Sequence, residues 1–367
     1  MAVKNHSGPS PLKVAIIGGG PGGLGAAIEF GKLNYVDWSL YEKKTQISET
    51  GGGISLQRHT WRLLELNGAA RNIDPLDFFR SPDGTSGQSR NGRTGKLLEQ
   101  HHHPKDTPPQ QFVRSYAFPE HKIKYNGQSA YRTIIHKPTA EKIEGIPKSP
   151  VFWQNTGGKY VFTCPLGGDD FEVTARIRRP IEGQEHVSWG RPFDFSTIAS
   201  EYDEFCEPVR KVIQLAAQGE TQEFALFSGP RLESVVHEEA IALIGDASHP
   251  LSGAFGAGAG FALEDVYALT QSVDWHWNNG GDLSAALELY DQIRSPHYRD
   301  LYKVLDDFGA MNTTLLSENL PVNEEIEERV RRAAESKSTW MYHYEIDKAV
   351  EKLLGAANQH GQVAAVL

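Results

Sequence analysis

An apolar strand that runs directly into a run of glycines constrains the fold of this chain most. Residues 14–17 are Val, Ala, Ile and Ile, and the sequence Gly-Gly-Gly-Pro-Gly-Gly follows them at residues 18–23. Apolar residues then recur at helical spacing through residues 24–33. This order predicts a β-strand, a tight turn and an α-helix, which is a unit of an open α/β sheet.

Three glycines of this turn fit the pattern Gly-x-Gly-x-x-Gly. Gly18 allows the turn, Gly20 leaves room for a pyrophosphate because it has no Cβ, and Gly23 lets the helix pack closely on the strand. The unpaired N–H groups at the start of the helix favour phosphate groups. We therefore expect these glycines to bind the pyrophosphate of a dinucleotide, although glycine-rich turns also occur where a chain simply reverses.

An acidic residue ends the next predicted strand. Residues 38–41 are Trp-Ser-Leu-Tyr, and Glu42 follows them, about 20 residues after the glycine turn. A carboxylate at this place binds the ribose of an adenosine and disfavours a ribose that carries a 2′-phosphate. Strand, turn, helix and acid together predict a dinucleotide site.

The charge balance of the chain disfavours anionic partners. The 367 residues include 37 Lys and Arg against 47 Asp and Glu, a formal net charge of −10, and no run of basic residues forms a stripe. We therefore expect neither nucleic acid nor an anionic membrane surface as a partner. We identify no signal peptide or membrane span, and we expect a cytoplasmic protein. Cys164 and Cys206 are too isolated for a disulfide framework and are expected to be free thiols.

A long polar stretch follows residue 80. Residues 80–111 are rich in Ser, Gly, Gln, Arg, Pro and His, which predicts a solvated loop longer than an ordinary connection. Asp83 and Gly84 lie there in a Ser-Pro-Asp-Gly-Thr sequence, which predicts a β-turn. Three consecutive histidines at residues 101–103 have no carboxylates or thiols at ligand spacing, so we expect no metal site.

Four later segments show the alternation that is typical of strands. They are residues 128–135, 151–153, 159–163 and 171–177. Gly-Gly pairs at residues 157–158 and 167–168 predict turns, so we expect an antiparallel sheet. Such a sheet would form the floor of a substrate pocket lined by aromatic residues, or its aromatic face would only pack against helices.

A second glycine-rich segment lies far along the chain. Residues 240–244 predict a strand that ends at Gly245 and Asp246, which would place the Asp246 carboxylate where open α/β sheets bind ligands. The run at residues 253–260 leads into a helix predicted to begin near residues 258–260, whose N–H groups favour negative charge. Further helices are predicted over residues 262–277, 283–308 and 324–354.

This second segment resembles a known family. Gly-Asp-Ala-Ser-His-Pro at residues 245–250, Gly-Ala-Gly-Ala-Gly at residues 256–260 and the pair Glu264-Asp265 are similar to the second FAD motif of the single-component aromatic-ring monooxygenases. These are the relatives of salicylate hydroxylase and para-hydroxybenzoate hydroxylase. The resemblance covers most of the chain and implies an α/β fold, in which a Rossmann-like FAD-binding lobe carries an inserted antiparallel substrate sheet and a helical C-terminal region. The domains it implies are residues 1–125 and 236–310 for two parts of the FAD lobe, residues 126–235 for the sheet and residues 311–367 for the helical region.

The resemblance also implies roles for single residues. The cofactor-binding residues that it implies are Gly18, Gly20 and Gly23 at the pyrophosphate, Glu42 at the adenosine ribose, Gly52 or Gly53 at the flavin side, Asp246 at the ribityl chain, and Gly258 and Ala259 near the ring. Arg132 matches an arginine that some fungal phenol hydroxylases direct toward a phenolate, since a guanidinium stays charged and pairs with an oxyanion. A salt bridge at the sheet edge is the alternative for Arg132. Cys164 stands before Pro165 where relatives can carry a tyrosine, which argues against a tyrosine-assisted mechanism.

The activity that the resemblance implies is that of a flavin monooxygenase. NADH or NADPH would reduce FAD, and one oxygen atom of O2 would go to a small aromatic or enolic substrate. The chain shows no dedicated nicotinamide-binding segment, so the reductant would bind transiently. We expect a monomer or a homodimer.

Residues 80–113 depart from the family pattern. Relatives carry there an arginine-bearing helix, further strands and an Asp-Gly motif, none of which is recognisable, and residues 113–116 look like the end of that missing segment. An internal deletion of this kind would remove strands from the parallel sheet and expose others. The departure favours one alternative to a monooxygenase, a degenerate or splice-shortened flavoprotein fold that acts as a binding protein. A flavin oxidase or dehydrogenase on the same scaffold is another alternative that stays open.

Overall fold

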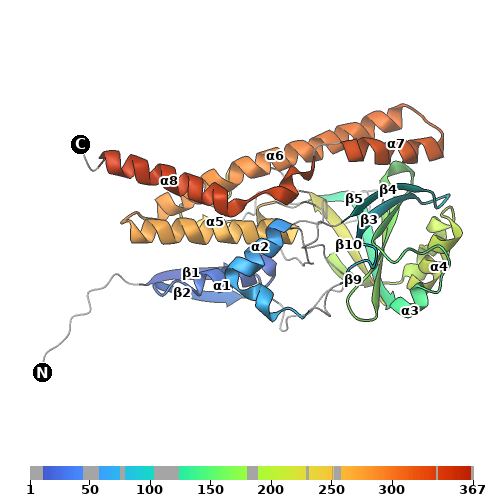
Figure 1. The fold of residues 1–367 in the computed structure, drawn as a ribbon, viewed down its shortest axis with the longest axis horizontal. Helices are drawn as coiled ribbons and strands as arrows, with labels where there is room; N and C mark the ends of the chain where they lie inside the picture. The colour runs from blue at the N-terminus through green and yellow to red at the C-terminus, as the bar shows by residue number, and fades with distance from the viewer. Residues whose placement is uncertain are drawn as a thin grey trace, which may run out of the picture.

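The structure is a computed structural model, and it places a helical lobe beside a large sheet. It describes residues 11–43, 58–74, 79–102, 124–179, 189–228, 231–249, 251, 258–335 and 338–364. Long helices and a two-stranded sheet make up one end of the molecule, and a large sheet flanked by short helices makes up the other (Figure 1).

The N-terminal segment has the predicted strand, turn and helix. β1 (Leu12–Ile17) pairs in parallel with β2 (Val36–Tyr41), and α1 (Pro21–Phe30) connects them. Gly18 has a φ of 103°, a conformation that favours glycine. A Cβ on Gly23 would lie 1.8 Å from the carbonyl oxygen of Gly18. The predicted close packing of helix on strand is therefore confirmed.

Eight strands form the large sheet, in the order β4-β3-β6-β7-β8-β5-β10-β9. Their bounds are β3 (Thr85–Asn91), β4 (Leu97–His102), β5 (Lys124–His136), β6 (Val151–Gln154), β7 (Tyr160–Pro165), β8 (Asp170–Arg178), β9 (Trp189–Phe193) and β10 (Thr221–Ser228). All neighbours are antiparallel except β3 and β6, which are parallel. The four predicted strand segments lie in β5, β6, β7 and β8, so the predicted antiparallel sheet is confirmed.

The prediction of a solvated loop over residues 80–111 is wrong where the structure describes this stretch, because β3 and β4 lie there. The two strands pair antiparallel, and polar side chains meet across them, such as Gln88, whose amide donates to the Oε1 of Gln100 at 3.1 Å. Polar strands of this kind show no alternation in hydropathy. The predicted β-turn is confirmed, since Gly84 has a φ of 76° and donates its N–H to the carbonyl oxygen of Ser81.

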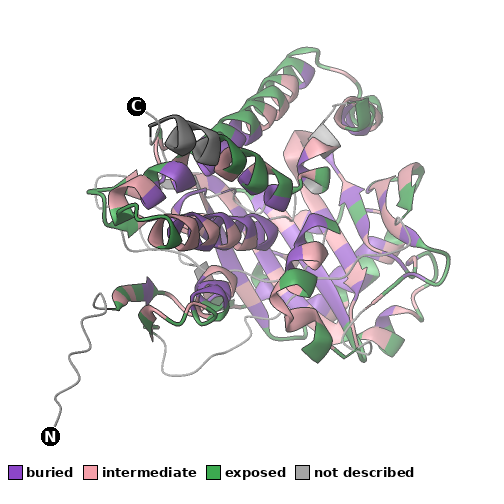
Figure 2. Cartoon of the chain, turned by 60° about the vertical axis from the view of Figure 1, so that its left-hand side comes forward, coloured by how far each residue is buried: buried purple, intermediate pink, exposed green. Residues whose placement is uncertain are grey.

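Two hydrophobic cores organise the molecule. The buried residues of the first core come from residues 16–63 and 235–350, and those of the second core come from residues 131–216. The first core packs α1 together with α2 (Arg58–Asn67), α5 (Gly258–Asn278), α6 (Leu283–Ser317) and α8 (Ile346–Ala364). The second core lies between the large sheet and α3 (Lys137–Ala140) and α4 (Glu207–Ala216). Figure 2 shows buried positions along α5 and through the sheet. In sequence, the sheet is therefore inserted between two parts of one lobe, as predicted.

The C-terminal third is helical, but one of the three predicted helices is interrupted in the structure. The helices predicted over residues 262–277 and 283–308 lie within α5 and α6. The helix predicted over residues 324–354 is broken, since α7 (Val322–Glu335) is followed by the 3₁₀ segment η8 (Ser338–His343) before α8 begins. Met341 of η8 is fully buried in the first core, so the break places an apolar side chain inside the molecule.

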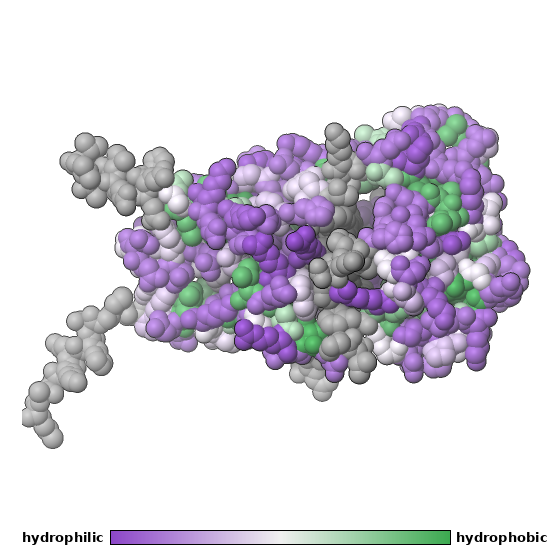
Figure 3. Space-filling model, in the orientation of Figure 1, coloured by the Kyte–Doolittle hydropathy of each residue, from purple (hydrophilic) through white to green (hydrophobic). Residues whose placement is uncertain are grey.

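The surface in the view of Figure 3 is mostly hydrophilic, with hydrophobic residues in scattered patches. Among the helices that the structure describes, none combines the length and the apolar composition that crossing a membrane requires. Cys164 and Cys206 are free thiols, as predicted.

Candidate cofactor site

The start of α1 offers backbone donors to an anion. Gly20 precedes the helix in an extended conformation (φ −84°, ψ −173°), Pro21 begins the helix, and no side chain in the described part of the chain caps it. The first N–H groups of a helix have no partner within the helix, and the helix dipole is positive at this end. The arrangement fits a pyrophosphate.

Glu42 lies against the same turn. Its Oε2 accepts a hydrogen bond from the N–H of Gly19 at 2.7 Å, and a Cβ on Gly19 would lie 3.2 Å from that oxygen. The structure thus brings together two features that the sequence predicts separately, the glycine turn and the acid after the second strand.

Residues on both sides of the second glycine-rich segment lie directly on the first segment. A Cβ on Gly22 would lie 3.5 Å from both the Cδ1 of Ile244 and the Cβ of Ala262. Ile244 immediately precedes the 3₁₀ turn η6 (Gly245–Ala247), and Ala262 lies near the start of α5. Gly245 has a φ of 59° and allows this sharp turn. Two segments that are far apart in the sequence therefore meet at one glycine of the first motif.

The strand predicted over residues 240–244 differs from the structure. β12 (Ile241–Ala242) pairs antiparallel with β11 (Val236–His237), and these two strands form a sheet of their own. The prediction that Asp246 ends a strand of an open parallel sheet is therefore wrong for the residues described. Ile244 is still extended (φ −130°, ψ 154°), so the half-buried Asp246 follows an extended segment.

The structure describes two of the four remaining residues that are predicted to bind the cofactor. α5 begins at Gly258, within the predicted range, and both Gly258 and Ala259 are buried. Their role near a flavin ring stays a prediction. Gly52 and Gly53 lie outside the described residues.

Arg132 lies on β5, in the interior of the large sheet rather than at its edge. Its Nε is 3.2 Å from the Oε1 of Glu172 and 3.4 Å from the Oγ1 of Thr174. Its guanidinium lies over the ring of Phe224, 5.0 Å from the ring centre. An ion pair within the sheet, one of the two interpretations of the sequence, is therefore present. The role of Arg132 toward a substrate stays a prediction.

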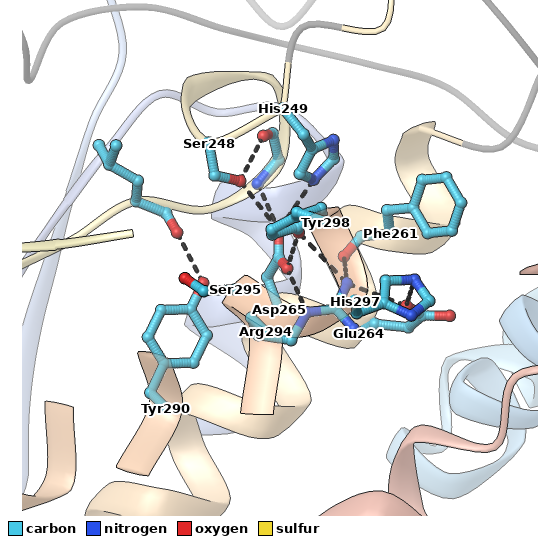
Figure 4. Close-up of polar contacts among 12 residues, drawn as sticks. Ser248, His249, Phe261, Glu264, Asp265, Tyr290, Arg294, Ser295, His297 and Tyr298 are labelled. Atoms are coloured by element: carbon cyan, nitrogen blue, oxygen red, sulfur yellow. Dashed lines mark hydrogen bonds and ion pairs between the residues drawn. The ribbon is translucent and has the colours of Figure 1, made fainter. Parts of the chain in front are cut away.

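Next to the second glycine-rich segment, α5 and α6 enclose a network of buried polar side chains (Figure 4). Arg294 on α6 places its Nη2 2.9 Å from the Oε2 of Glu264 and its Nε 2.7 Å from the Oδ1 of Asp265. The Nε2 of His249 lies 3.0 Å from the Oδ2 of Asp265. All four side chains are fully buried. The acid pair was recognisable in the sequence, whereas its partners on α6 were not.

Burial and charge drive the pKa values of the two adjacent acids apart. Burial raises the pKa of Glu264 to about 8, although Arg294 opposes the shift. Burial alone would also raise the pKa of Asp265, but Arg294 and His249 bring that pKa below its ordinary value. Near neutral pH, Asp265 is therefore the ionised partner of Arg294, whereas Glu264 holds a proton.

Comparison with known proteins gives partial matches in sequence. No protein-family model matches the chain. A salicylate hydroxylase of Pseudomonas putida is 30% identical over 143 residues, which is 38% of this chain and 32% of the relative. The FAD-dependent monooxygenase SAT7 of Stachybotrys chartarum is 23% identical over 180 residues, which is 46% of this chain and 38% of the relative. The chain spans about a third of the length of the curated relatives it matches.

Comparison with solved structures extends the likeness to nearly the whole fold. A salicylate hydroxylase in a substrate complex superposes with a TM-score of 0.74 at 19% identity and covers 95% of this chain and 98% of its own. CtdE in complex with FAD and a substrate superposes with a TM-score of 0.73 at 13% identity, over 95% of this chain and 100% of its own. The chain therefore has the fold of these two proteins, and part of its sequence is similar to a salicylate hydroxylase and to an FAD-dependent monooxygenase.

The fold shared with these proteins agrees with the arrangement predicted from the sequence. The α/β lobe holds the first glycine turn and the described residues of the second segment, the large sheet is inserted between the two parts of that lobe, and the helical region follows. The fold class predicted from the sequence is confirmed. An internal deletion relative to the FAD-dependent monooxygenases stays a prediction.

Proposed function

We propose that the chain is an FAD-dependent monooxygenase that uses NADH or NADPH and O2 to hydroxylate a small aromatic or enolic substrate. The observation that carries this proposal is the meeting of the two glycine-rich segments, where Gly22 lies against Ile244 and Ala262. FAD is long enough for one part of the protein to bind its pyrophosphate and another part to bind near its flavin. The relatives that match in sequence and fold are FAD-dependent monooxygenases.

The residues present fit FAD. The uncapped start of α1 suits the pyrophosphate, and Glu42 is within hydrogen-bond distance of the same turn. We propose that Gly18, Gly20 and Gly23 hold the pyrophosphate, Glu42 the adenosine ribose, Asp246 the ribityl chain, and Gly52, Gly53, Gly258 and Ala259 the flavin. Bound FAD would supply the redox chemistry with the reductant and O2.

A row of side chains across the large sheet supports a substrate site on the same face as Arg132. In the strand registers, Arg132 lies opposite Thr174, Thr174 opposite Phe162, and Phe162 opposite Phe152. Tyr131, the neighbour of Arg132 in β5, faces the second core on the other side of the sheet. The face of Arg132 therefore combines a cation with aromatic rings, which suits an aromatic substrate with an oxyanion.

The ion pair with Glu172 orients Arg132 toward the proposed substrate site. The Glu172 side chain is 3% exposed and that of Arg132 is 32% exposed, so the ion pair has a buried and a solvent-accessible end. A guanidinium that is held by one carboxylate keeps a fixed orientation toward a second anion. We propose that the protein binds and orients the substrate through this group and excludes water from the reacting carbon.

The full chain loaded with FAD tests this proposal. Oxidation of NADH and NADPH is measured with and without a panel of phenols and hydroxylated aromatic acids, under isotopically labelled O2. Substrate-dependent oxidation with labelled product supports the monooxygenase. Oxidised product without the label indicates a flavin oxidase or dehydrogenase. A folded, FAD-loaded chain that turns over none of the panel contradicts the proposed activity.

The second candidate is a degenerate flavoprotein fold that serves as a binding protein. Exposed apolar residues on the sheet of β1 and β2 favour it. Ile17 and Tyr41 lie opposite each other in β1 and β2 and are 60% and 58% exposed. In the described residues this sheet has two strands. Exposed apolar strand positions are what an internal deletion near residues 80–113 would leave. According to this second proposal, the chain would fold but would not convert any substrate.

The division of the chain into domains at residues 125, 235 and 310 also remains a proposal. β3 and β4 precede the first of these boundaries and yet pair within the large sheet.

A further inference from the structure

We propose that Asp265 is a positioning residue, which orients the turn that carries Asp246 by dividing its two carboxylate oxygens between that turn and α6. The proposal rests on the proposed FAD binding. Asp265 would act through the turn rather than by contacting FAD itself. Figure 4 shows its carboxylate between the turn and the helix.

One oxygen of Asp265 serves the turn. Its Oδ2 accepts a hydrogen bond from the backbone N–H of Gly245 at 2.7 Å and lies 3.0 Å from the Nε2 of His249. The Oγ of Ser248 lies 3.5 Å from the same oxygen and donates to the carbonyl oxygen of Gly245 at 2.8 Å. These contacts hold residues on both sides of Asp246. The direction in which Asp246 points therefore depends on this oxygen.

The other oxygen of Asp265 serves α6. Its Oδ1 accepts hydrogen bonds from the Nε of Arg294 at 2.7 Å and from the hydroxyl of Tyr298. One turn earlier on α6, the hydroxyl of Tyr290 donates to the carbonyl oxygen of Leu243 at 2.6 Å. α6 thus holds the segment that leads into the turn directly, and holds the turn itself through Asp265.

The charge on Asp265 strengthens its contacts with the turn. A carboxylate accepts stronger hydrogen bonds than a neutral acid does, because the N–H groups point at a full negative charge. Arg294 and His249 counteract the effect of burial and lower the pKa of Asp265, so it stays ionised. Glu264 is equally buried and also contacts Arg294, but its other close contacts are with His59 on α2 and His297 on α6 rather than with the turn. Glu264 is therefore a matched control.

Substitutions on the two sides of this carboxylate separate positioning from stability. Asp265→Asn keeps the size of the side chain but removes its charge and one acceptor oxygen. His249→Phe keeps a ring between Phe261 and Tyr298 but removes a donor to the turn-side oxygen. Tyr298→Phe removes a donor to the α6-side oxygen, and Glu264→Gln removes the neighbouring acid.

The experiment measures FAD affinity by quenching of FAD fluorescence on the full apo chain, and the melting temperature of each variant without FAD. Asp265→Asn should weaken FAD binding by about 10- to 100-fold, the range for a hydrogen bond to a charged group. His249→Phe should weaken FAD binding in the same direction. Tyr298→Phe and Glu264→Gln should lower or shift the melting temperature with FAD affinity within about threefold of wild type.

The outcomes distinguish this inference from the proposed function. FAD affinity in Asp265→Asn and His249→Phe that equals the wild-type affinity overturns the inference alone. Losses of affinity that follow the melting temperature equally in all four variants also overturn it, since the network would then act only on stability. If Asp265→Asn does not fold, the comparison of His249→Phe with Tyr298→Phe decides. A folded wild-type chain that binds no FAD overturns the proposed function, and this inference with it.

Discussion

Gly23 lies so close to Gly18 that a Cβ on residue 23 would be 1.8 Å from the carbonyl oxygen of residue 18. This distance is far inside van der Waals contact, so α1 can keep its position on β1 only with glycine at residue 23. The same packing sets where the start of α1 meets the turn. The glycine turn is therefore a requirement of the fold as well as the candidate pyrophosphate site.

Gly23→Ala should destabilise the protein by about 1–3 kcal/mol, the usual cost of overpacking, and weaken FAD binding. Thermal unfolding and FAD titration measure the two effects. Gly309→Ala on α6 is the control, because its Cβ would meet nothing within 4 Å and alanine favours a helix. A melting temperature of Gly23→Ala equal to that of wild type would contradict the packing argument.

Asp246→Ala should lower FAD affinity by about tenfold or more, because a carboxylate that accepts from ribityl hydroxyl groups is lost. The melting temperature without FAD should change little, since the side chain is half-buried at the surface of the turn. Asp300→Ala, at an exposed ion pair with Lys303 on α6, provides the control for removing an acid. Flavin content that is unchanged in Asp246→Ala would rule out its assigned role.

Arg132→Met should raise the KM for an aromatic substrate by about tenfold or more and leave FAD affinity unchanged. The chain offers a matched control in Arg191, which pairs with the buried Glu223 at 2.5 Å on the face of the sheet that holds Tyr131. Arg191→Met breaks an ion pair of the same kind without touching the proposed substrate face. If the two variants changed the KM equally, Arg132 would have only a structural role, and the proposed contact with substrate would be contradicted.

Glu264 should make stability depend on pH. Its pKa rises from an ordinary 4.5 to about 8 on folding, so between these values the folded chain binds a proton that the unfolded chain has lost. Raising the pH through this window therefore favours unfolding. In Glu264→Gln the side chain at this position cannot ionise. The melting temperature of this variant should therefore rise relative to that of wild type as the pH increases from about 5 to about 8. A difference that stays constant over this window would contradict the shift.

Backbone signals made the first glycine-rich site predictable from the sequence. The order of apolar strand, glycines and helix determines local geometry, and Glu42 needs only one further strand to reach the turn. The strand length and partner of residues 240–244 were not predictable in the same way. Strand pairing depends on segments elsewhere in the chain, and β12 pairs with β11 rather than with β1.

The polar parts of the fold were the least visible in the sequence. β3 and β4 carry few apolar residues, and the side chains that meet across them are polar, as Gln88 and Gln100 are. The partners of Asp265 on α6 lie about 30 residues further on and reach it only through tertiary packing. One signal was present, since Arg294 interrupts an otherwise apolar helical stripe with Tyr290, Tyr298 and Leu301. A lone cation on such a stripe indicates a buried acid as its partner.

The central claim is that this chain binds FAD through the two glycine-rich segments that meet at Gly22. The most direct test purifies the full chain, removes free small molecules, records the visible flavin absorption, and repeats the spectrum after excess FAD and a second desalting. We predict a folded protein that retains about one FAD per chain, with a flavin spectrum shifted from that of free FAD. A folded chain that stays colourless after incubation with excess FAD would contradict the claim.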